Sequence, residues 1–509
     1  MNKVYSAAII GLEAELIEVE ADLSSGLRFF GIVGLPDKSV EESRERVAAA
    51  IKNSGAEPPQ KFNKRVIINL APADLRKEGS GYDLPIAMGF LLASEQIKFD
   101  SQNKIFVGEL ALDGKIRKVD GVLPICLLAK EKGIDSVFVP KANAKEAALV
   151  DGVKIYPIDS LAELIGFLEK RIELLPVPTL NIDIESFEPV IYEVDMAYIK
   201  GQENAKRAIE IAASGNHNIL LTGPPGSGKT LLAKAIPSIL PKMTRDETLE
   251  VTKIYSVSGK LSSKYPLITQ RPFRSPHHSA SEASLIGGGS FARPGEITLA
   301  HRGVLFIDEF PEVHRDVLES LRQPLEDGII HVSRAKAAYT FPARFILVAA
   351  MNPCPCGYFG DPEKECKCSP HEITRYQRKI SGPIMDRIDL YVEVPHVKYE
   401  KLTDGNIDGS SAEIRKKVEK ARKIQLERFK NEKIKSNSEM TIPLVKKHCG
   451  VDEDGDQLLR NAVNNLHMSA RGYHRILKLA RTIADLADSP HITHNHIAEA
   501  LQYRPKLEI

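Results

Sequence analysis

The chain has 509 residues, of which 43% are hydrophobic and 27% are charged, a composition that disfavours a disordered chain or a coiled rod. At roughly 150 residues per domain, its length predicts about three domains. The formal net charge is only +1, so a nucleic-acid surface must be a local patch. No apolar run approaches the ~18 residues of a membrane span, and we expect a cytoplasmic protein without membrane contact.

The first 175 residues alternate short β-branched runs with helical stretches, which predicts an α/β domain. Strands are expected at residues 66–68 and 137–139, and helices at 39–51 and 123–132. Residues 176–195 are rich in proline and lack periodicity, so they predict a linker.

A phosphate-binding loop follows the next predicted strand, residues 218–222, and precedes a predicted helix at 231–239. Its glycines let backbone N–H groups converge on phosphates, its lysine supplies a positive charge, and its threonine offers a hydroxyl to Mg²⁺. The predicted nucleotide-binding residues are Gly223, Pro224, Pro225, Gly226, Ser227, Gly228, Lys229 and Thr230.

Two further buried strands, at 303–307 and 344–348, lead into polar residues. Asp308 and Glu309 follow the first of them, where open α/β sheets bind ligands. We expect Asp308 to hold Mg²⁺ and Glu309 to polarise the attacking water. Asn352 follows the other strand, and its amide suits the positioning of that water because it both donates and accepts.

Two insertions carry cations. Residues 271–293 contain Arg274, His277 and His278 beside a run of glycines, which favours contact with DNA or structural packing over a metal site. Residues 328–340 predict a β-hairpin with Arg334 and Lys336 near its tip. These two cations fit contact with phosphate backbones and an ordinary solvent-exposed tip equally well.

Four cysteines lie close together on a loop rich in glycine and proline at 354–368. Four thiolates suit tetrahedral Zn²⁺, although CxC pairs are tighter than the usual CxxC spacing and leave free or redox-active thiols as an alternative. The predicted zinc ligands are Cys354, Cys356, Cys366 and Cys368.

Together with Met385-Asp386-Arg387 and the helix around Arg471, these motifs resemble an AAA+ ATPase. The stretches at 342–345, 381–387 and 469–475 resemble the magnesium-chelatase-like branch of that class. More narrowly, Arg274-Ser-Pro-His-His278, the glycines at 287–289 and Cys354-Pro-Cys356-Gly357 resemble the bacterial YifB/ComM family over essentially the whole chain.

This resemblance implies ATP and Mg²⁺ as cofactors and a ring, usually a homo-hexamer, with ATP at the subunit interfaces. Arg387 is then the arginine finger from a neighbour, and Arg471, or alternatively Arg475, is the sensor-2 arginine. The implied domains are an AAA+ core at 196–397, built on a parallel sheet with β-hairpin insertions, and a helical lid at 398–509.

Residues 108–114 and 121–140 resemble the proteolytic domain of Lon proteases, which has a ribosomal S5 domain 2-like fold. Peptidase activity is therefore an alternative. Lon chemistry uses a serine and a lysine, but Leu123 stands at the lysine position and Gly81, beside Ser80, at the serine position. Leucine cannot carry a proton, so we expect this domain to be catalytically inactive.

Three functions fit these features. The resemblance implies an ATP-driven motor on single-stranded or branched DNA, a helicase or branch-migration enzyme in the recombination of incoming DNA. The second is a metal-insertion ATPase like the magnesium-chelatase motor subunit, or one that remodels a protein partner. The third is a scaffold whose ATP state gates partner binding. Retention of Lys229, Asp308 and Glu309 speaks against the scaffold.

Overall fold

The computed structural model describes residues 3–180, 192–288, 293–334, 337–397, 409–465 and 468–505. The chain forms two compact units. Unit 1 comprises residues 1–187 and 245–268, and unit 2 comprises residues 188–244 and 269–509. None of the helices in the described ranges has both the length and the apolar character needed to cross a membrane. Most of the predicted linker, from 181 to 191, lies outside the described residues.

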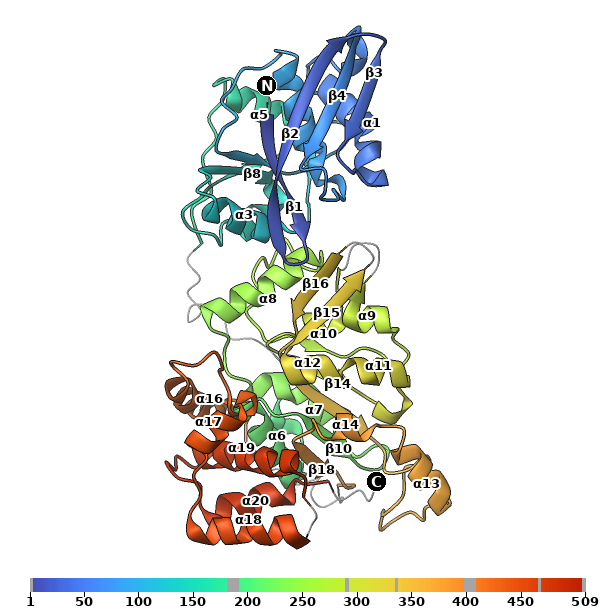
Figure 1. Ribbon diagram of the computed structural model, residues 1–509, viewed down its shortest axis with the longest axis vertical. Coiled ribbons are helices and arrows are strands. Elements are labelled where there is room, and N and C mark those ends of the chain that lie inside the picture. The colour runs from blue at the N-terminus through green and yellow to red at the C-terminus, as the bar shows by residue number, and fades with distance from the viewer. Residues whose placement is uncertain are drawn as a thin grey trace. The chain divides into compact units, whose positions relative to one another are not determined.

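A seven-stranded mixed sheet in the order β3-β4-β2-β1-β5-β8-β9 forms the centre of unit 1 (Figure 1). β2 pairs antiparallel with β1 and β4, and the four other pairs are parallel. The strands are β1 (Lys3–Ile10), β2 (Glu13–Ser25), β3 (Phe29–Val33), β4 (Lys64–Ala71), β5 (Lys104–Phe106), β8 (Ser136–Pro140) and β9 (Lys154–Ile158).

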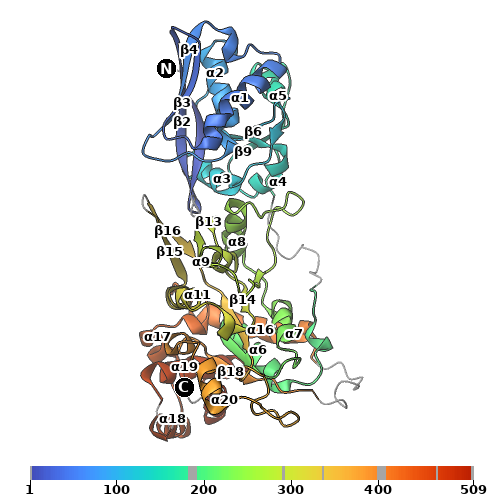
Figure 2. The ribbon, with the colours of Figure 1, turned by 90° about the vertical axis from the view of Figure 1, so that its right-hand side faces the viewer.

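Helices cover both faces of this sheet, because successive strand residues point to opposite sides. Phe106 and Phe138 belong to one hydrophobic cluster with α1 (Lys38–Asn53), α2 (Asp83–Ala93) and α5 (Leu161–Leu168). Ile105 and Val137 belong to a second cluster with α3 (Val122–Glu131) and α4 (Ala144–Ala147). Figure 2 shows α1 and α2 beside the strands β2 to β4. The α/β prediction for this region is confirmed.

Unit 1 also contains a helix from the middle of the sequence, α8 (Arg245–Val257). Leu249 packs against the second hydrophobic cluster, and Lys253 Nζ lies 2.6 Å from Glu13 Oε1. The Ser256 carbonyl accepts a hydrogen bond from Gly121 N at 3.1 Å, and its hydroxyl donates to the buried Glu146 carboxylate. The units therefore differ from the domains drawn from sequence at 1–175 and 196–397.

A five-stranded parallel sheet in the order β11-β14-β17-β10-β18 forms the centre of unit 2. β14 and β17 are buried at every position, as expected of strands covered on both faces. The strands are β10 (Ile219–Thr222), β11 (Phe273–Arg274), β14 (Val304–Ile307), β17 (Ile346–Met351) and β18 (Leu390–Glu393).

One hydrophobic cluster joins this sheet to α6 (Glu203–Gly215), α7 (Lys229–Ile239) and the C-terminal helices. The predicted hairpin is present as β15 (Ile329–Arg334) and β16 (Ala337–Pro342), which pair antiparallel. The predicted helical region is also confirmed. Its helices are α16 (Ser411–Arg428), α17 (Ile442–His448), α18 (Glu453–Asn465), α19 (Ala470–Leu486) and α20 (His494–Gln502).

Candidate ATP site and cysteine cluster

The loop between β10 and α7 is open on the side where phosphates would bind. Gly226 and Gly228 have φ values of +77° and +93°, and a Cβ added at either would meet no atom within 4 Å. Their backbones therefore border open space in a conformation that favours glycine. Among the described residues, the buried Ser227 hydroxyl has no hydrogen-bond partner. Both features fit a bound phosphate chain.

Lys229 lies buried at the start of α7, where its ammonium group is held by oxygen atoms. Its Nζ donates to the carbonyls of Gly223 and Pro224 at 2.7 and 2.8 Å, and to Asn352 Oδ1 at 3.2 Å. Burial lowers the pKa of Lys229, whereas the nearby Asp308 carboxylate acts to raise it. The lysine and the asparagine, 123 residues apart in the chain, therefore share one site.

The two predicted magnesium ligands are in direct contact, since Thr230 Oγ1 donates to Asp308 Oδ2 at 2.8 Å. A hydroxyl beside a carboxylate at the end of parallel strands fits Mg²⁺, which prefers oxygen ligands. The residues present thus fit an ATP–Mg²⁺ complex, in which the metal ion would neutralise charge on the β- and γ-phosphates.

Glu309 follows Asp308 in a left-handed backbone conformation with φ of +51°. Its carboxylate lies 3.1 Å from His278 Nδ1, at the end of the Arg274–His278 motif. The imidazole therefore contacts one oxygen of the Glu309 carboxylate, the group that sequence analysis expects to polarise the attacking water. Sequence analysis missed this pairing because it treated His278 as a possible DNA contact.

Arg387 lies at the opposite edge of the sheet from the phosphate loop. It precedes β18, whereas Lys229 follows β10, and a four-residue strand spans about 13 Å. The guanidinium donates to the Pro383 carbonyl and to Glu326, which lowers the pKa of that carboxyl.

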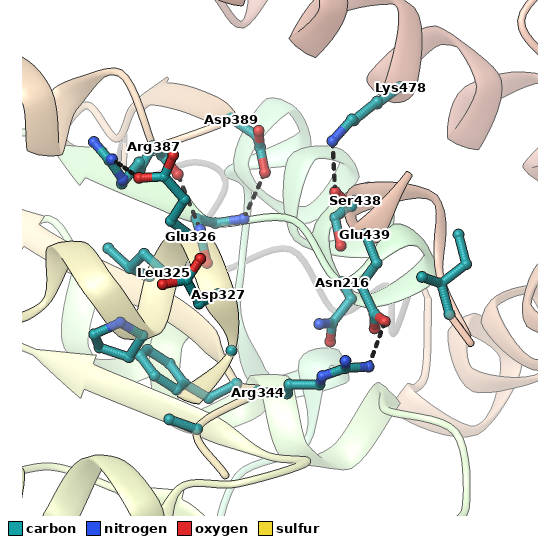
Figure 3. Close-up of a pocket in the computed structure, with 16 residues that line it drawn as sticks. Asn216, Leu325, Glu326, Asp327, Arg344, Arg387, Asp389, Ser438, Glu439 and Lys478 are labelled. Carbon is teal, nitrogen blue, oxygen red and sulfur yellow. Dashed lines mark hydrogen bonds and ion pairs between the residues drawn. The ribbon is translucent and has the colours of Figure 1, made fainter. Parts of the chain in front are cut away.

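Arg387 and Glu326 line a cavity of about 280 Å³ between the sheet edge and the helical region (Figure 3). Across this cavity, Arg344 pairs with Glu439 at 2.9 Å, and Lys478 donates to the Ser438 carbonyl at 2.8 Å.

The two candidate sensor-2 arginines lie at this same edge. The Arg475 side chain hydrogen-bonds to the backbone, since its Nη1 donates to the Ile388 carbonyl at 2.5 Å. Arg471 is exposed near the first turn of α19, and its charge contributes to the lowered pKa of Glu326. Arg475 is therefore engaged within its own chain, whereas Arg471 is exposed.

The four predicted zinc ligands come together, with all four sulfur atoms within 4.8 Å of one another. Cys354, Cys356 and Cys366 have sulfur separations of 3.4 to 3.7 Å. A tetrahedron of thiolates at a Zn–S distance of about 2.3 Å has edges of about 3.8 Å, so this cluster can hold a metal ion of that size. A Cβ at Gly357 would lie 2.6 Å from Pro225, which places the cluster beside the phosphate loop.

Arg274 and His277, two of the residues singled out for DNA contact, have partners within the chain. Arg274 forms a two-point ion pair with Glu296 at 2.5 and 2.8 Å, so it ties the insertion to α10 (Glu296–Leu299). His277 Nδ1 lies 2.7 Å from the Ser279 hydroxyl. The Arg334 side chain and Lys336 lie outside the described part of the chain.

The chain matches three family models along its length. They are "Magnesium chelatase, subunit ChlI" over residues 195–402, "Subunit ChlI of Mg-chelatase" over 19–143, and "Magnesium chelatase, subunit ChlI C-terminal" over 408–504. It is 44% identical to the competence protein ComM of Haemophilus influenzae, covering 99% of this chain and 98% of that protein. The chain belongs to the YifB/ComM family.

Another relative of this YifB/ComM protein is also similar over the full length of the chain. YifB of Escherichia coli is 42% identical over 99% of this chain and 97% of its own. The ChlI models identify an ATPase domain, which implies that the chain hydrolyses ATP.

A Lon protease of Mycolicibacterium smegmatis is 24% identical over 31% of this chain and 21% of that protein. The residues at the positions of the Lon serine and lysine lie in unit 1 of this YifB/ComM protein. The Leu123 side chain is fully buried in the core, and the Ser80 hydroxyl donates to Glu109, which also pairs with Arg117.

Proposed function

We propose that this protein is an ATP-driven ring motor that acts on DNA, as a helicase or branch-migration enzyme in the recombination of DNA entering the cell. The observation that carries the proposal is full-length similarity to a competence protein in a chain whose phosphate loop, Asp308, Glu309 and Asn352 surround one site. Competence is the ability of bacteria to take up DNA. In this proposal unit 1, apart from α8, is an inactive Lon-like domain.

The position of Arg387 supports a ring. The Arg387 guanidinium lies at the sheet edge opposite its own phosphate loop, and Arg471 lies near it. Neither can reach the nucleotide of its own chain from that edge, whereas both can reach a nucleotide bound by a neighbour in a closed, head-to-tail ring. We therefore assign both arginines to the site of an adjacent subunit, in a homo-hexamer.

Adding DNA should raise the rate of ATP hydrolysis several-fold, because a motor couples turnover to its track. The measurement is steady-state hydrolysis with single-stranded, forked and four-way-junction DNA, with Lys229→Ala as the blank. Lys336→Glu, in the sequence between β15 and β16, should abolish the stimulation, since charge reversal repels phosphates. Lys446→Glu, the same change at an exposed lysine of α17, should retain it. If DNA still stimulates ATP hydrolysis in K336E, the hairpin does not contact DNA.

Hydrolysis that is indifferent to every DNA would instead favour the second candidate, an ATPase that drives metal insertion or remodels a protein partner. The ChlI models support this candidate directly, as they match 195–402 and 408–504.

We further propose that the four-cysteine cluster binds Zn²⁺ and braces the loop that carries Asn352. Cys356→Ser should lower bound zinc from one ion per chain to near zero and reduce ATP turnover, because Asn352 lies two residues before Cys354. Metal content is measured by mass spectrometry on the purified chain. Cys449→Ala, a buried cysteine far from the cluster in sequence, is the control and should keep its zinc. Equal zinc in the wild type and Cys356→Ser would refute the assignment.

A further inference from the structure

An exposed patch at one end of β3 and β4 combines an aromatic ring with cations. We call it the β3–β4 patch; it comprises Leu27, Arg28, Phe29, Asn63, Lys64 and Arg65. All six residues are exposed, with Leu27 at 92% and Phe29 at 49%. Single exposed leucines are common on protein surfaces, but a half-exposed phenylalanine among three cations is a more specific feature.

The Phe29 ring has a fixed position on the edge strand. Phe29 pairs in register with Arg65, whose guanidinium carbon lies 5.4 Å from the ring centroid. A Cβ added to Gly31 would lie only 2.4 Å from Phe29 Cε1, so the ring extends over a position that has no side chain. A ring held in place in this way can stack on a base at little cost in side-chain entropy.

The cations of the β3–β4 patch are available to an external anion. Among the described residues, Arg28, Lys64 and Arg65 form no ion pair, whereas the adjacent Lys61 lies 3.6 Å from Glu57. Arg28 Nε donates to Asn63 Oδ1 at 3.1 Å, which ties the β2–β3 turn to the start of β4 and leaves its two Nη groups available. Arg28 precedes Phe29 in the chain and Lys64 precedes its strand partner Arg65, so three cations lie close to one ring in the strand register. This combination suits the phosphates and bases of a nucleic-acid strand.

We propose that the β3–β4 patch binds single-stranded nucleic acid, with one base stacked on Phe29 and phosphates held by Arg28, Lys64 and Arg65. This site lies in unit 1, includes no residue of the β15–β16 hairpin, and requires no nucleotide. It goes beyond the proposed motor function and does not depend on it. A protein strand added to the β3 edge is the competing use of this surface, and the aromatic and charged variants distinguish the two.

The test is fluorescence anisotropy of a labelled oligothymidine of about 15 nucleotides, titrated with the full-length protein without ATP. The titrations are repeated in a Lys336→Glu background so that the hairpin does not mask the effect. Phe29→Leu should weaken binding roughly tenfold, since leucine keeps the apolar bulk but has no π face, and Phe29→Tyr should retain it. Reversing all three charges should weaken binding further and reduce the slope of log affinity against log salt by about 2.

Lys132→Glu is the matched control, because Lys132 is an exposed lysine at the end of α3, which packs on the other half of the same sheet. It should bind like the wild type. Wild-type affinity in Phe29→Leu and in the charge-reversed chain would overturn the proposal. So would a loss of self-association without a loss of DNA affinity, which would make the patch a contact between copies. If the patch variants lose binding while DNA fails to stimulate hydrolysis, the motor proposal fails and this site stands.

Discussion

Replacing Arg387 by alanine should lower the steady-state rate of ATP hydrolysis by about a thousandfold or more and leave ATP binding largely unchanged. The guanidinium lies at the sheet edge opposite its own phosphate loop, so its role would be to stabilise charge on a nucleotide held by the neighbouring subunit. Binding is measured with a fluorescent ATP analogue and turnover by phosphate release. Arg378→Ala, an exposed arginine at the end of α13 (Pro370–Gln377), should hydrolyse ATP at the normal rate.

Mixing two inactive variants separates action on a neighbour from action within one chain. An Arg387→Ala chain keeps its phosphate loop, and a Lys229→Ala chain keeps its arginine. In mixed rings some interfaces therefore combine an intact loop with an intact arginine, and we expect part of the activity to return. No recovery at any mixing ratio, in rings shown to contain both chains, would contradict the assignment to a neighbouring subunit.

The central strands of unit 2 could be predicted from sequence because each is a short apolar run that ends in polar residues. Residues 218–222, 303–307 and 344–348 correspond to β10, β14 and β17. The place of α8 could not be predicted. Its sequence specifies an amphipathic helix but not which surface covers its apolar side, and it packs on α3 about 120 residues earlier in the chain.

The candidate site also combines residues that can be predicted from sequence with contacts that cannot. A phosphate loop has a fixed spacing within eight residues, so Lys229 and Thr230 can be recognised locally. The partners of Arg387 and Glu309 come from distant segments: Glu326 is 61 residues from Arg387, and His278 is 31 residues from Glu309. No local pattern specifies such pairs, because a charged residue in a loop is compatible with many partners until the fold selects one.

Glu309→Gln should reduce ATP hydrolysis by roughly a hundredfold to ten-thousandfold while retaining ATP binding, because an amide keeps the size of the carboxylate but cannot accept a proton from water. The side chain is partly exposed and pairs with His278, so its replacement removes no buried apolar contact. Binding, ring formation and single-turnover hydrolysis are measured on the same preparation. Loss of ATP binding in Glu309→Gln would indicate a structural role.

His278→Ala separates the effect of losing the Glu309 carboxylate from the effect of losing its contact with His278. This variant removes the 3.1 Å contact but leaves Glu309 able to act as a base, so it should retain much more turnover than Glu309→Gln. If His278 restrains the carboxylate, the variant should also hydrolyse ATP faster than the wild type without DNA, because the freed oxygen can turn toward the phosphates. Equal losses in both variants would instead mean that the histidine–glutamate pair builds the site, and that Glu309 needs this partner to reach the attacking water.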